Sequence, residues 1–226
     1  MNSVPVSVVA VLGPPASGKA AVATALATRG AAVFRVREAA QLLARTEPII
    51  AGVVDGCPDG WLPDLLAHDL MRTALDTAVG RVLVLEGYPG TTAAARSLQL
   101  CLKARSRRLS VIELTARPGI LAARLARRRV CPEGHRAPGR SHAPGPSVSG
   151  PGRCGACDAP LTVRDIDRGP LADGRLARYA ANQAGIRTAL EGDSTVAWHT
   201  LTADPDSPDP AFCVVNLLAC AEGMLR

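Results

Sequence analysis

Short apolar runs alternate along the chain with longer segments that mix apolar and polar residues. The runs predict strands at Val6–Leu12, Ala32–Val36, Arg81–Leu85, Leu109–Leu114 and Thr195–Leu201. They are rich in valine and leucine, which is typical of strands that are covered on both faces. The pattern therefore predicts an α/β fold with a five-stranded parallel sheet and helices on both faces.

The segments between these runs have the composition of helices. Helices are predicted at Lys19–Thr28, Glu38–Arg45, Asp64–Val79, Thr91–Ala104, Pro118–Arg129, Leu171–Leu190 and Asp209–Glu222. Pro118 falls at the first turn of its helix, where the missing N–H has no intrahelical acceptor to lose. A chain of 226 residues with 47% hydrophobic residues can bury the core of one such domain.

A glycine-bearing loop follows the first predicted strand and reads G-P-P-A-S-G-K at residues 13–19. The spacing G-x-x-x-x-G-K between a strand and a helix is typical of loops whose backbone N–H groups hold phosphate oxygens. Lys19 would then place its ammonium on the outer phosphates. Only two of the 26 lysine and arginine residues, Lys19 and Lys103, are lysines. The basic composition of the chain therefore does not explain a lysine at this loop position. The alternative is a plain strand-to-helix turn with a solvated lysine.

The position after the lysine departs from the usual phosphate-loop motif. A serine or threonine there would hold magnesium, whereas this chain has Ala20 and Ala21. Phosphate binding depends on the backbone and Lys19, so we expect it to persist. Direct coordination of the metal by the loop is not expected.

Two cysteine-bearing segments flank an interval rich in proline, glycine and serine. Cys154 and Cys157 form a C-x-x-C turn, and Cys131 with His135 could complete a tetrahedral site. His142 could replace His135 as the fourth ligand. The spacing predicts a closed, structural zinc site, and free thiols on a flexible loop are the alternative.

Composition and charge narrow the class of partner. The formal charge of +6 comes almost wholly from arginine, which suits phosphate-bearing partners. Aromatic residues make up only 3% of the chain, which disfavours a base-stacking surface for nucleic acid. No positively charged signal region or membrane-spanning stretch is visible, and seven cysteines do not suggest a disulfide framework. We therefore expect a cytoplasmic, monomeric protein that binds nucleotides and no membrane.

In their order and spacing, these motifs resemble the adenylate kinase family in its form with a long, zinc-bearing lid. The resemblance runs nearly from end to end. It is carried by G-P-P-A-S-G-K at 13–19, G-W-L-P-D at 60–64, L-E-G-Y-P-G-T at 85–91, A-R-L-A-R-R-R-V-C at 123–131, C-x-x-C at 154–157 and L-T-V-R-D-I-D at 161–167.

The resemblance implies three parts of the chain. Residues 1–34, 80–129 and 166–226 would form a core of the P-loop NTPase type, residues 35–79 an acceptor-binding helical segment, and residues 130–165 the lid with its zinc. The implied reaction moves the γ-phosphoryl group of ATP, bound with Mg²⁺, to AMP or a related nucleoside monophosphate.

The resemblance also assigns residues to the donor nucleotide. These are Gly13, Pro15, Ala16, Ser17, Gly18, Lys19, Ala20, Ala21, Arg124 and Arg128. Arg124 would lie against the donor adenine, and Arg128, one predicted helical turn later, would reach the donor phosphates. Arg164 and Arg175 would close over the transferred group, so the implied catalytic residues are Lys19, Arg128, Arg164 and Arg175.

The acceptor half departs from the family. Its implied residues are Asp64, Glu86, Gly87, Tyr88 and Gly90, together with Arg164 and Arg175. Where the family reads D-G-F-P-R-T, this chain reads E-G-Y-P-G-T at 86–91, so Gly90 replaces the arginine that clamps the acceptor phosphate. A replacement clamp could come from Arg35, Arg37, Arg45 or Arg96.

Three functions are consistent with these residues. The first is a phosphotransferase of the adenylate kinase type. The second is a nucleotide-binding relative without turnover, serving as a sensor or a partner protein, which Gly90 and Ala20 favour. The third, a zinc-bearing RNA-binding module, rests on the arginine content and is disfavoured by the few aromatic residues.

Overall fold

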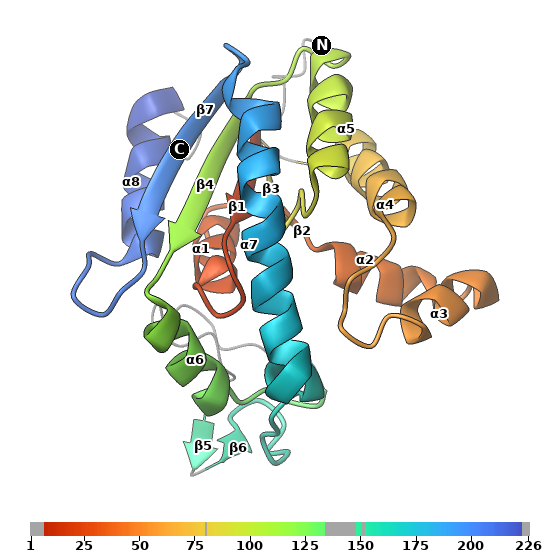
Figure 1. Cartoon of the computed structure of the whole chain (residues 1–226), viewed down its shortest axis with the longest axis vertical. Coiled ribbons are helices and arrows are strands. Elements are labelled where there is room, and N and C mark those ends of the chain that lie inside the picture. The colour runs from red at the N-terminus through yellow and green to blue at the C-terminus, as the bar shows by residue number, and fades with distance from the viewer. Residues whose placement is uncertain (1–6, 80, 134–147, 151, 223–226) are drawn as a thin grey trace.

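The protein is seen here as a computed structural model that describes residues 7–79, 81–133, 148–150 and 152–222 (Figure 1). Its centre is a five-stranded parallel sheet with the strand order β2-β3-β1-β4-β7. The strands are β1 Ser7–Leu12, β2 Ala32–Phe34, β3 Val82–Glu86, β4 Leu109–Thr115 and β7 Val196–Thr202. The predicted α/β fold with a five-stranded parallel sheet is therefore confirmed.

Helices cover both faces of this sheet. They are α1 Lys19–Ala27, α2 Val36–Leu43, α3 Pro48–Asp55, α4 Asp64–Thr77, α5 Thr92–Lys103, α6 Pro118–Arg127, α7 Gly169–Glu191 and α8 Pro210–Glu222. α4, α5 and α7 pack on one face, and α1 and α8 on the other (Figure 1).

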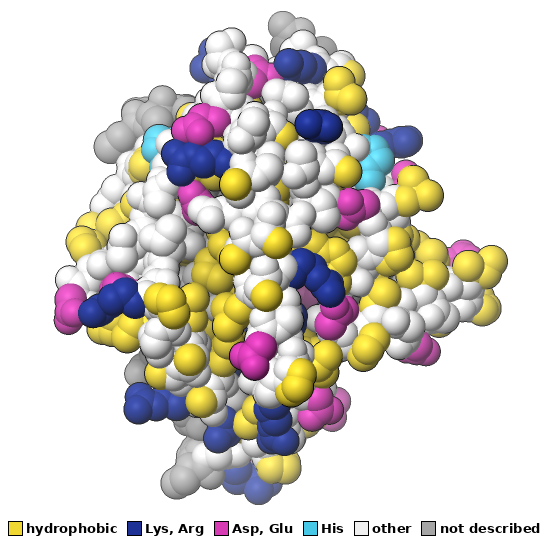
Figure 2. Space-filling model, in the orientation of Figure 1, with side chains coloured by type: hydrophobic (Ala, Val, Ile, Leu, Met, Phe, Trp, Pro, Cys, Tyr) yellow, Lys and Arg dark blue, Asp and Glu magenta, His cyan; other side chains and the backbone are white. Residues whose placement is uncertain are grey.

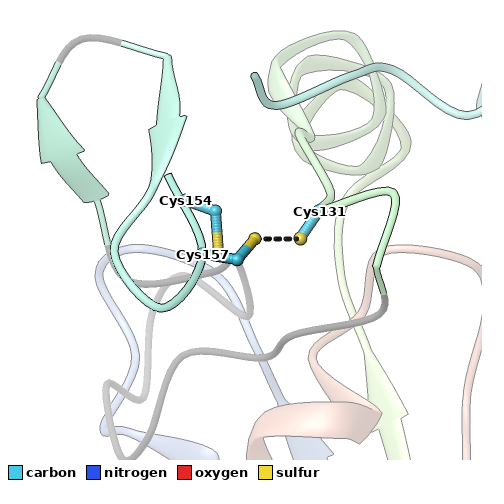
Figure 3. A group of neighbouring side chains, drawn as sticks. All are labelled: Cys131, Cys154 and Cys157. Carbon is cyan, nitrogen blue, oxygen red and sulfur yellow. Dashed lines mark hydrogen bonds between the residues drawn. The ribbon is translucent and has the colours of Figure 1, made fainter. Parts of the chain in front are cut away.

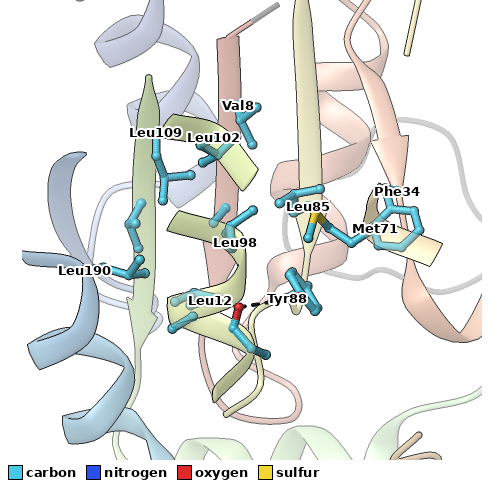
Figure 4. Close-up of a cluster of buried hydrophobic side chains, with 14 of the residues drawn as sticks. Val8, Leu12, Phe34, Met71, Leu85, Tyr88, Leu98, Leu102, Leu109 and Leu190 are labelled. Carbon is cyan, nitrogen blue, oxygen red and sulfur yellow. Dashed lines mark hydrogen bonds between the residues drawn. The ribbon is translucent and has the colours of Figure 1, made fainter. Parts of the chain in front are cut away.

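The core divides according to the two faces of the sheet. Along β1, Val8 and Leu12 face α4, α5 and α7, whereas Val9 and Val11 face α1 and α8. This alternation follows from the pleat of a strand, in which successive side chains point to opposite faces. Figure 4 shows the first cluster, in which Met71 of α4 packs near Phe34 at the sheet edge. The apolar side chains of β1 from Val8 to Leu12 thus serve both layers.

A buried carboxylate ties α7 to the sheet. Glu113 on β4 is only 1% exposed and accepts hydrogen bonds from Tyr179 and Gln183 of α7. It also accepts from Trp198 Nε1 at 3.2 Å and from Thr200 Oγ1 at 3.3 Å, both on β7. A buried charge needs such donors to offset its lost hydration, so this contact fixes the middle of α7 against β4 and β7.

A glycine allows α5 and α7 to approach closely. A Cβ placed on Gly185 in α7 would lie 2.1 Å from Thr92 Oγ1 at the start of α5. A side chain at position 185 would therefore require Thr92 or the helix to move. Glycine is unfavourable within a helix, so its use here is explained by packing rather than by helix propensity.

An arm formed by α2 and α3 projects from the body of the molecule (Figure 1). Only the first of these helices was predicted. α3 has no buried residue, and Ile49 on it is 82% exposed. Its sequence P-I-I-A-G-V-V-D is a short, mostly apolar segment, and a segment of this kind does not distinguish a helix from a strand.

The α6 helix ends two residues earlier than predicted. It stops at Arg127, and Arg128 adopts an extended conformation with ψ 129°. The chain leaves the helix because Val130 pairs with Thr162 in an antiparallel bridge, with hydrogen bonds of 2.8 and 2.9 Å. The prediction that Arg128 lies one helical turn after Arg124 on the same face is therefore wrong.

A small substructure follows this bridge. β5 Val148–Gly150 pairs antiparallel with β6 Arg153–Cys154, and a short 3₁₀ helix, Asp165–Asp167, leads into α7. Val130 and Thr162 join the two ends of this segment at the foot of α6. The segment thereby sits beside the carboxyl-terminal edge of the sheet.

Candidate functional site

A cleft of about 1620 Å³ opens at the carboxyl ends of the strands. Residues that follow β1, β2, β3 and β7 line it, together with α6, the segment before α7 and the start of α7 itself. Ligands of parallel α/β proteins bind at this edge because the loops there converge. Nine cationic and six acidic side chains line the cleft, so it carries a net positive charge. Figure 2 shows Lys and Arg side chains gathered at the end of the molecule where α6 lies.

The glycine-bearing loop between β1 and α1 forms one wall. Gly13 has φ 144°, and a Cβ there would lie 2.6 Å from the carbonyl oxygen of Leu114. Gly18 has φ 102° and directly precedes α1. Both positions therefore require glycine, the first because of space and both because of backbone conformation. All eight loop residues that were assigned to the donor phosphates line the cleft.

The N-terminus of α1 is open to this cleft. Within the described part of the chain, the backbone N–H groups of Gly18, Lys19 and Ala20 have no hydrogen-bond acceptor. The Ser17 Oγ atom is also buried without a partner among the described residues. Free N–H groups at a helix N-terminus attract anions through their partial positive charge. The loop can therefore accept an anionic group.

Lys19 folds back over this loop. Its Nζ donates to the carbonyl oxygens of Gly13 at 2.6 Å and Pro14 at 2.7 Å. Burial lowers the pKa of Lys19 from 10.5 to about 8, the charge of Glu86 opposes this shift, and Arg175 and Arg128 add to it. The ammonium thus lies among other cations, an arrangement that an incoming anion would stabilise.

Three arginines from separate parts of the chain converge on Asp167, whose side chain is fully buried. Arg164 donates from Nε and from a terminal nitrogen at 2.9 and 3.0 Å, and Arg175 donates at 2.9 Å. Arg128 Nε lies 3.8 Å from the same carboxylate. One carboxylate faces three guanidinium groups, so the cluster has an excess of positive charge beside Lys19. The sequence predicted the arginines but not Asp167 as the residue that gathers them.

Arg124 joins the glycine loop to the end of β7. It donates to the carbonyl oxygen of Ala203 at 2.6 Å and to that of Ala16 at 3.5 Å. Arg124 and Arg128 both line the cleft, as do Arg164 and Arg175. The structure therefore brings every residue assigned to the donor nucleotide, and all four implied catalytic residues, to one cavity.

Only some of the residues implied for the acceptor lie in the cleft. Glu86, Gly87 and Gly90 line the cleft, whereas Asp64 and Tyr88 do not. Asp64 accepts a hydrogen bond of 2.5 Å from the hydroxyl of Thr91, the N-cap residue of α5. Tyr88 is buried in the core, and its hydroxyl donates to the carbonyl oxygen of Ala94 at 3.4 Å (Figure 4). These two side chains hold the start of α5 in place.

Trp61 fills the space beside Gly90. A Cβ on Gly90 would lie 2.9 Å from Cη2 of the indole and 3.0 Å from Cζ2. Arg178 of α7 lies over the same ring at 4.8 Å from its centroid and pairs with Asp59 at 2.7 Å. Asp59 in turn accepts from the backbone N–H of Trp61 at 2.9 Å. No sequence motif predicted a role for Trp61 or Arg178, because only the tertiary structure brings these residues to Gly90.

Three cysteines lie together beside the cleft (Figure 3). The Sγ atoms of Cys131, Cys154 and Cys157 are all within 4.8 Å of one another, and those of Cys131 and Cys157 are 3.5 Å apart. Four sulfur ligands of zinc at about 2.3 Å would be separated by about 3.8 Å, so the spacing fits a metal. The two histidines named as fourth ligand, His135 and His142, lie outside the described residues.

Backbone groups favour an ionised thiol in this cluster. The N–H of Ala156 donates to Cys154 Sγ at 3.5 Å and lowers the pKa of that thiol to about 7. The N–H of Ala159 acts in the same direction on Cys157, but burial and the two neighbouring sulfurs raise the pKa of that thiol to about 11. One thiol of the three therefore ionises readily, and thiolate is the form that binds metal.

The fold and the cleft define an α/β protein with a parallel sheet and a cationic cleft at its carboxyl edge. Comparison with known proteins does not narrow this class, since no protein-family model matches the chain and no curated protein matches it significantly. Among the described residues, no helix combines the length and apolar character needed to cross a membrane.

Proposed function

We propose that the protein is a phosphotransferase of the adenylate kinase type, which binds ATP with Mg²⁺ in the cleft and transfers the γ-phosphoryl group to a nucleoside monophosphate. One observation carries the proposal. The open N-terminus of α1, with Lys19, shares a cavity with the arginines gathered by Asp167. The charges of Arg128 and Arg175 act on Lys19, so these groups would act on the same phosphates.

The arrangement suits the chemistry of phosphoryl transfer. An acceptor oxygen forms a bond to the γ-phosphorus while the bond to the β–γ bridging oxygen breaks, and negative charge spreads over the transferred oxygens. Lys19 and the loop N–H groups would hold the β- and γ-phosphates. Arg164 and Arg175 would stabilise the charge that develops during transfer, because fixed cations in a site shielded from water act strongly on it.

Magnesium would enter with the nucleotide. When bound, it neutralises charge on the β- and γ-phosphates. Ala20 offers no hydroxyl to it, so the loop itself does not fit direct coordination. Glu86 lies in the cleft, and its charge acts on Lys19. This carboxylate could hold the hydrated ion through water.

A structural zinc ion belongs to the same proposal. Cys131, Cys154 and Cys157 would supply three ligands, and His135 or His142 the fourth. The metal would join the end of α6 to the hairpin of β5 and β6. Such a small segment has little core of its own, so metal binding would supply the free energy that orders it.

A coupled assay of ATP turnover with a panel of nucleoside monophosphates tests the proposal. Lys19→Ala should reduce turnover by about 100-fold or more, since it removes a cation from the phosphate site. Lys103→Ala is the matched control, because Lys103, the last residue of α5, pairs with Asp193 after α7 and does not line the cleft. Equal activity of the wild type and Lys19→Ala would reject catalysis at this loop.

One observation favours a second function. Trp61 occupies the place of a side chain at Gly90, where the resemblance expects the arginine that clamps the acceptor. A nucleotide-binding relative without turnover would keep the donor half and lose the acceptor half. It would show a higher melting temperature with ATP and no product with any monophosphate.

A further inference from the structure

Four arginines were candidates for a replacement acceptor clamp, and their surroundings separate them. Arg45 and Arg96 are exposed and do not line the cleft. Arg35 lines it but is engaged by two carboxylates, since its Nε donates to Glu86 and its terminal nitrogen lies 3.4 Å from Glu38. Arg37 also lines the cleft and forms no hydrogen bond or ion pair with the described residues.

The guanidinium group of Arg37 is partly buried against the protein. Its NH1 atom is buried and has no acceptor among the residues that the structure describes. It lies against the backbone of Gly60, where a Cβ would be 2.1 Å from NH1. A buried cationic donor without an acceptor is unfavourable in the absence of a ligand. The position is therefore suited to an anion supplied from outside the chain.

The charges around Arg37 also favour an anion. Burial lowers the pKa of Arg175, Asp167 opposes this shift, and the charges of Arg164 and Arg37 add to it. Arg37 and Arg175 therefore lie close enough to repel each other across the cleft. Asp59, the acidic residue next to Gly60, is already paired with Arg178. An anion between the two arginines would relieve their repulsion.

The loop that contacts Arg37 also occupies the space beside Gly90, where the resemblance expects the arginine that clamps the acceptor. Gly60 leaves room for the Arg37 guanidinium, and Trp61 occupies the space beside Gly90. These two neighbouring residues thus exclude a cation at residue 90 and admit one from the start of α2. On this view, the cation that the resemblance expects at residue 90 is supplied by Arg37 instead.

We propose that Arg37 binds the phosphomonoester group of the acceptor, with Trp61 as the wall of that subsite beside Gly90. The inference rests on the proposed function, because it takes the other half of the cleft to hold the donor. A guanidinium group donates two parallel hydrogen bonds to phosphate oxygens, which fixes both the position and the orientation of the acceptor. The acceptor is therefore a small molecule that ends in a phosphate monoester.

Calorimetric titration with AMP and with ribose 5-phosphate tests this subsite, and adenosine serves as the uncharged match for AMP. Arg37→Ala should weaken the binding of both phosphate esters by about tenfold or more, because a charge-assisted pair is removed. Arg37→Gln, which keeps most of the side-chain length, should do the same and guards against a misfolded alanine variant. Arg45→Ala, on the same arm, should change binding by less than about twofold.

The outcomes separate the two proposals. ATP titrations of the wild type and Lys19→Ala report on the donor half alone. If ATP binding depends on Lys19 but both Arg37 variants bind AMP as Arg45→Ala does, the subsite is wrong and the proposed function stands. If ATP does not bind while the esters bind through Arg37, the proposed function is wrong. No saturable binding of either ester at millimolar concentration, or equal binding of adenosine and AMP, overturns the subsite.

Discussion

The indole ring of Trp61 lies against Gly90, with Cη2 only 2.9 Å from the position that a Cβ would take. Arg178 lies over the ring, 4.8 Å from its centroid, and is itself paired with Asp59. A larger residue at position 90 therefore has to displace the indole or the backbone. The two residues act as a matched pair in shaping the cleft.

This pairing predicts the effect of enlarging residue 90. Gly90→Ala should lower the free energy of unfolding by about 1–3 kcal/mol, the usual effect of overpacking, and Gly90→Arg by more. Denaturant unfolding measures this change. In the background of Trp61→Ala the same substitution should have a much smaller effect, because the obstructing ring is gone. An unchanged penalty in that background would contradict the contact.

The pKa of Lys19 predicts how ATP affinity depends on pH. ATP should bind the protonated ammonium more tightly than the neutral amine, so the affinity should be constant below about pH 8 and fall as the pH rises through that value. Binding slightly above pH 8 should take up a proton, which calorimetry in buffers of different ionisation enthalpy measures. Lys19→Arg, which stays charged, should show neither effect.

The same shift affects the unliganded protein. Between pH 8 and 10.5 the unfolded chain holds more protons at Lys19 than the folded protein, so Lys19 contributes increasing stability as the pH rises. Comparison of the wild type with Lys19→Met over this range isolates the contribution. A pH dependence that is the same in both proteins would place the Lys19 pKa near its ordinary value.

The cysteine cluster predicts about one zinc ion per chain. The double variant Cys154→Ser with Cys157→Ser should lose the metal, and a chelator should lower the melting temperature of the wild type but not of the variant. Metal analysis and thermal melting measure these results. Cys213→Ser, on α8, is the control because Cys213 lies outside the cluster. Metal-free wild-type protein with unchanged melting on chelation would refute the site.

Asp167 predicts the stability of the arginine cluster. Asp167→Asn removes the charge that Arg128, Arg164 and Arg175 share, and should lower the free energy of unfolding by about 2–4 kcal/mol. The lower part of this range applies because the arginines are partly solvated. Asp173→Asn, an exposed neighbour on α7, should change it by less than about 0.5 kcal/mol. Equal losses in the two variants would contradict the role of Asp167.

The sequence predicted those parts of the fold whose signal is local. The strands of the parallel sheet are rich in apolar residues, so all five of them were found, and Pro118 marked the start of α6 correctly. α3 was missed because it is only eight residues long and mostly apolar, a pattern that fits a strand as well as a helix. The end of α6 was misplaced because it depends on the pairing of Val130 with Thr162, which lie far apart in the sequence.

In the candidate site, too, residues in local motifs were predicted and residues that depend on tertiary structure were not. The loop at 13–19 and the three cysteines were found because each follows a short spacing, and the structure brings the cysteines together. Asp167 and Trp61 were not recognised, because their roles depend on which residues the fold places around them. The choice of Arg37 over Arg45 likewise required the position of Gly60.

The anchoring of α7 by Glu113 has a consequence for motion in the cleft. The helix has 23 residues and is about 35 Å long. Because Tyr179 and Gln183 bind the buried carboxylate, the turn that carries Arg175 cannot shift without breaking these bonds. Arg128 and Arg164 lie outside helices, so the fold restrains them less than it restrains Arg175. If the cleft binds a nucleotide as we propose, Arg175 should keep its position while Arg128 and Arg164 adjust to the ligand.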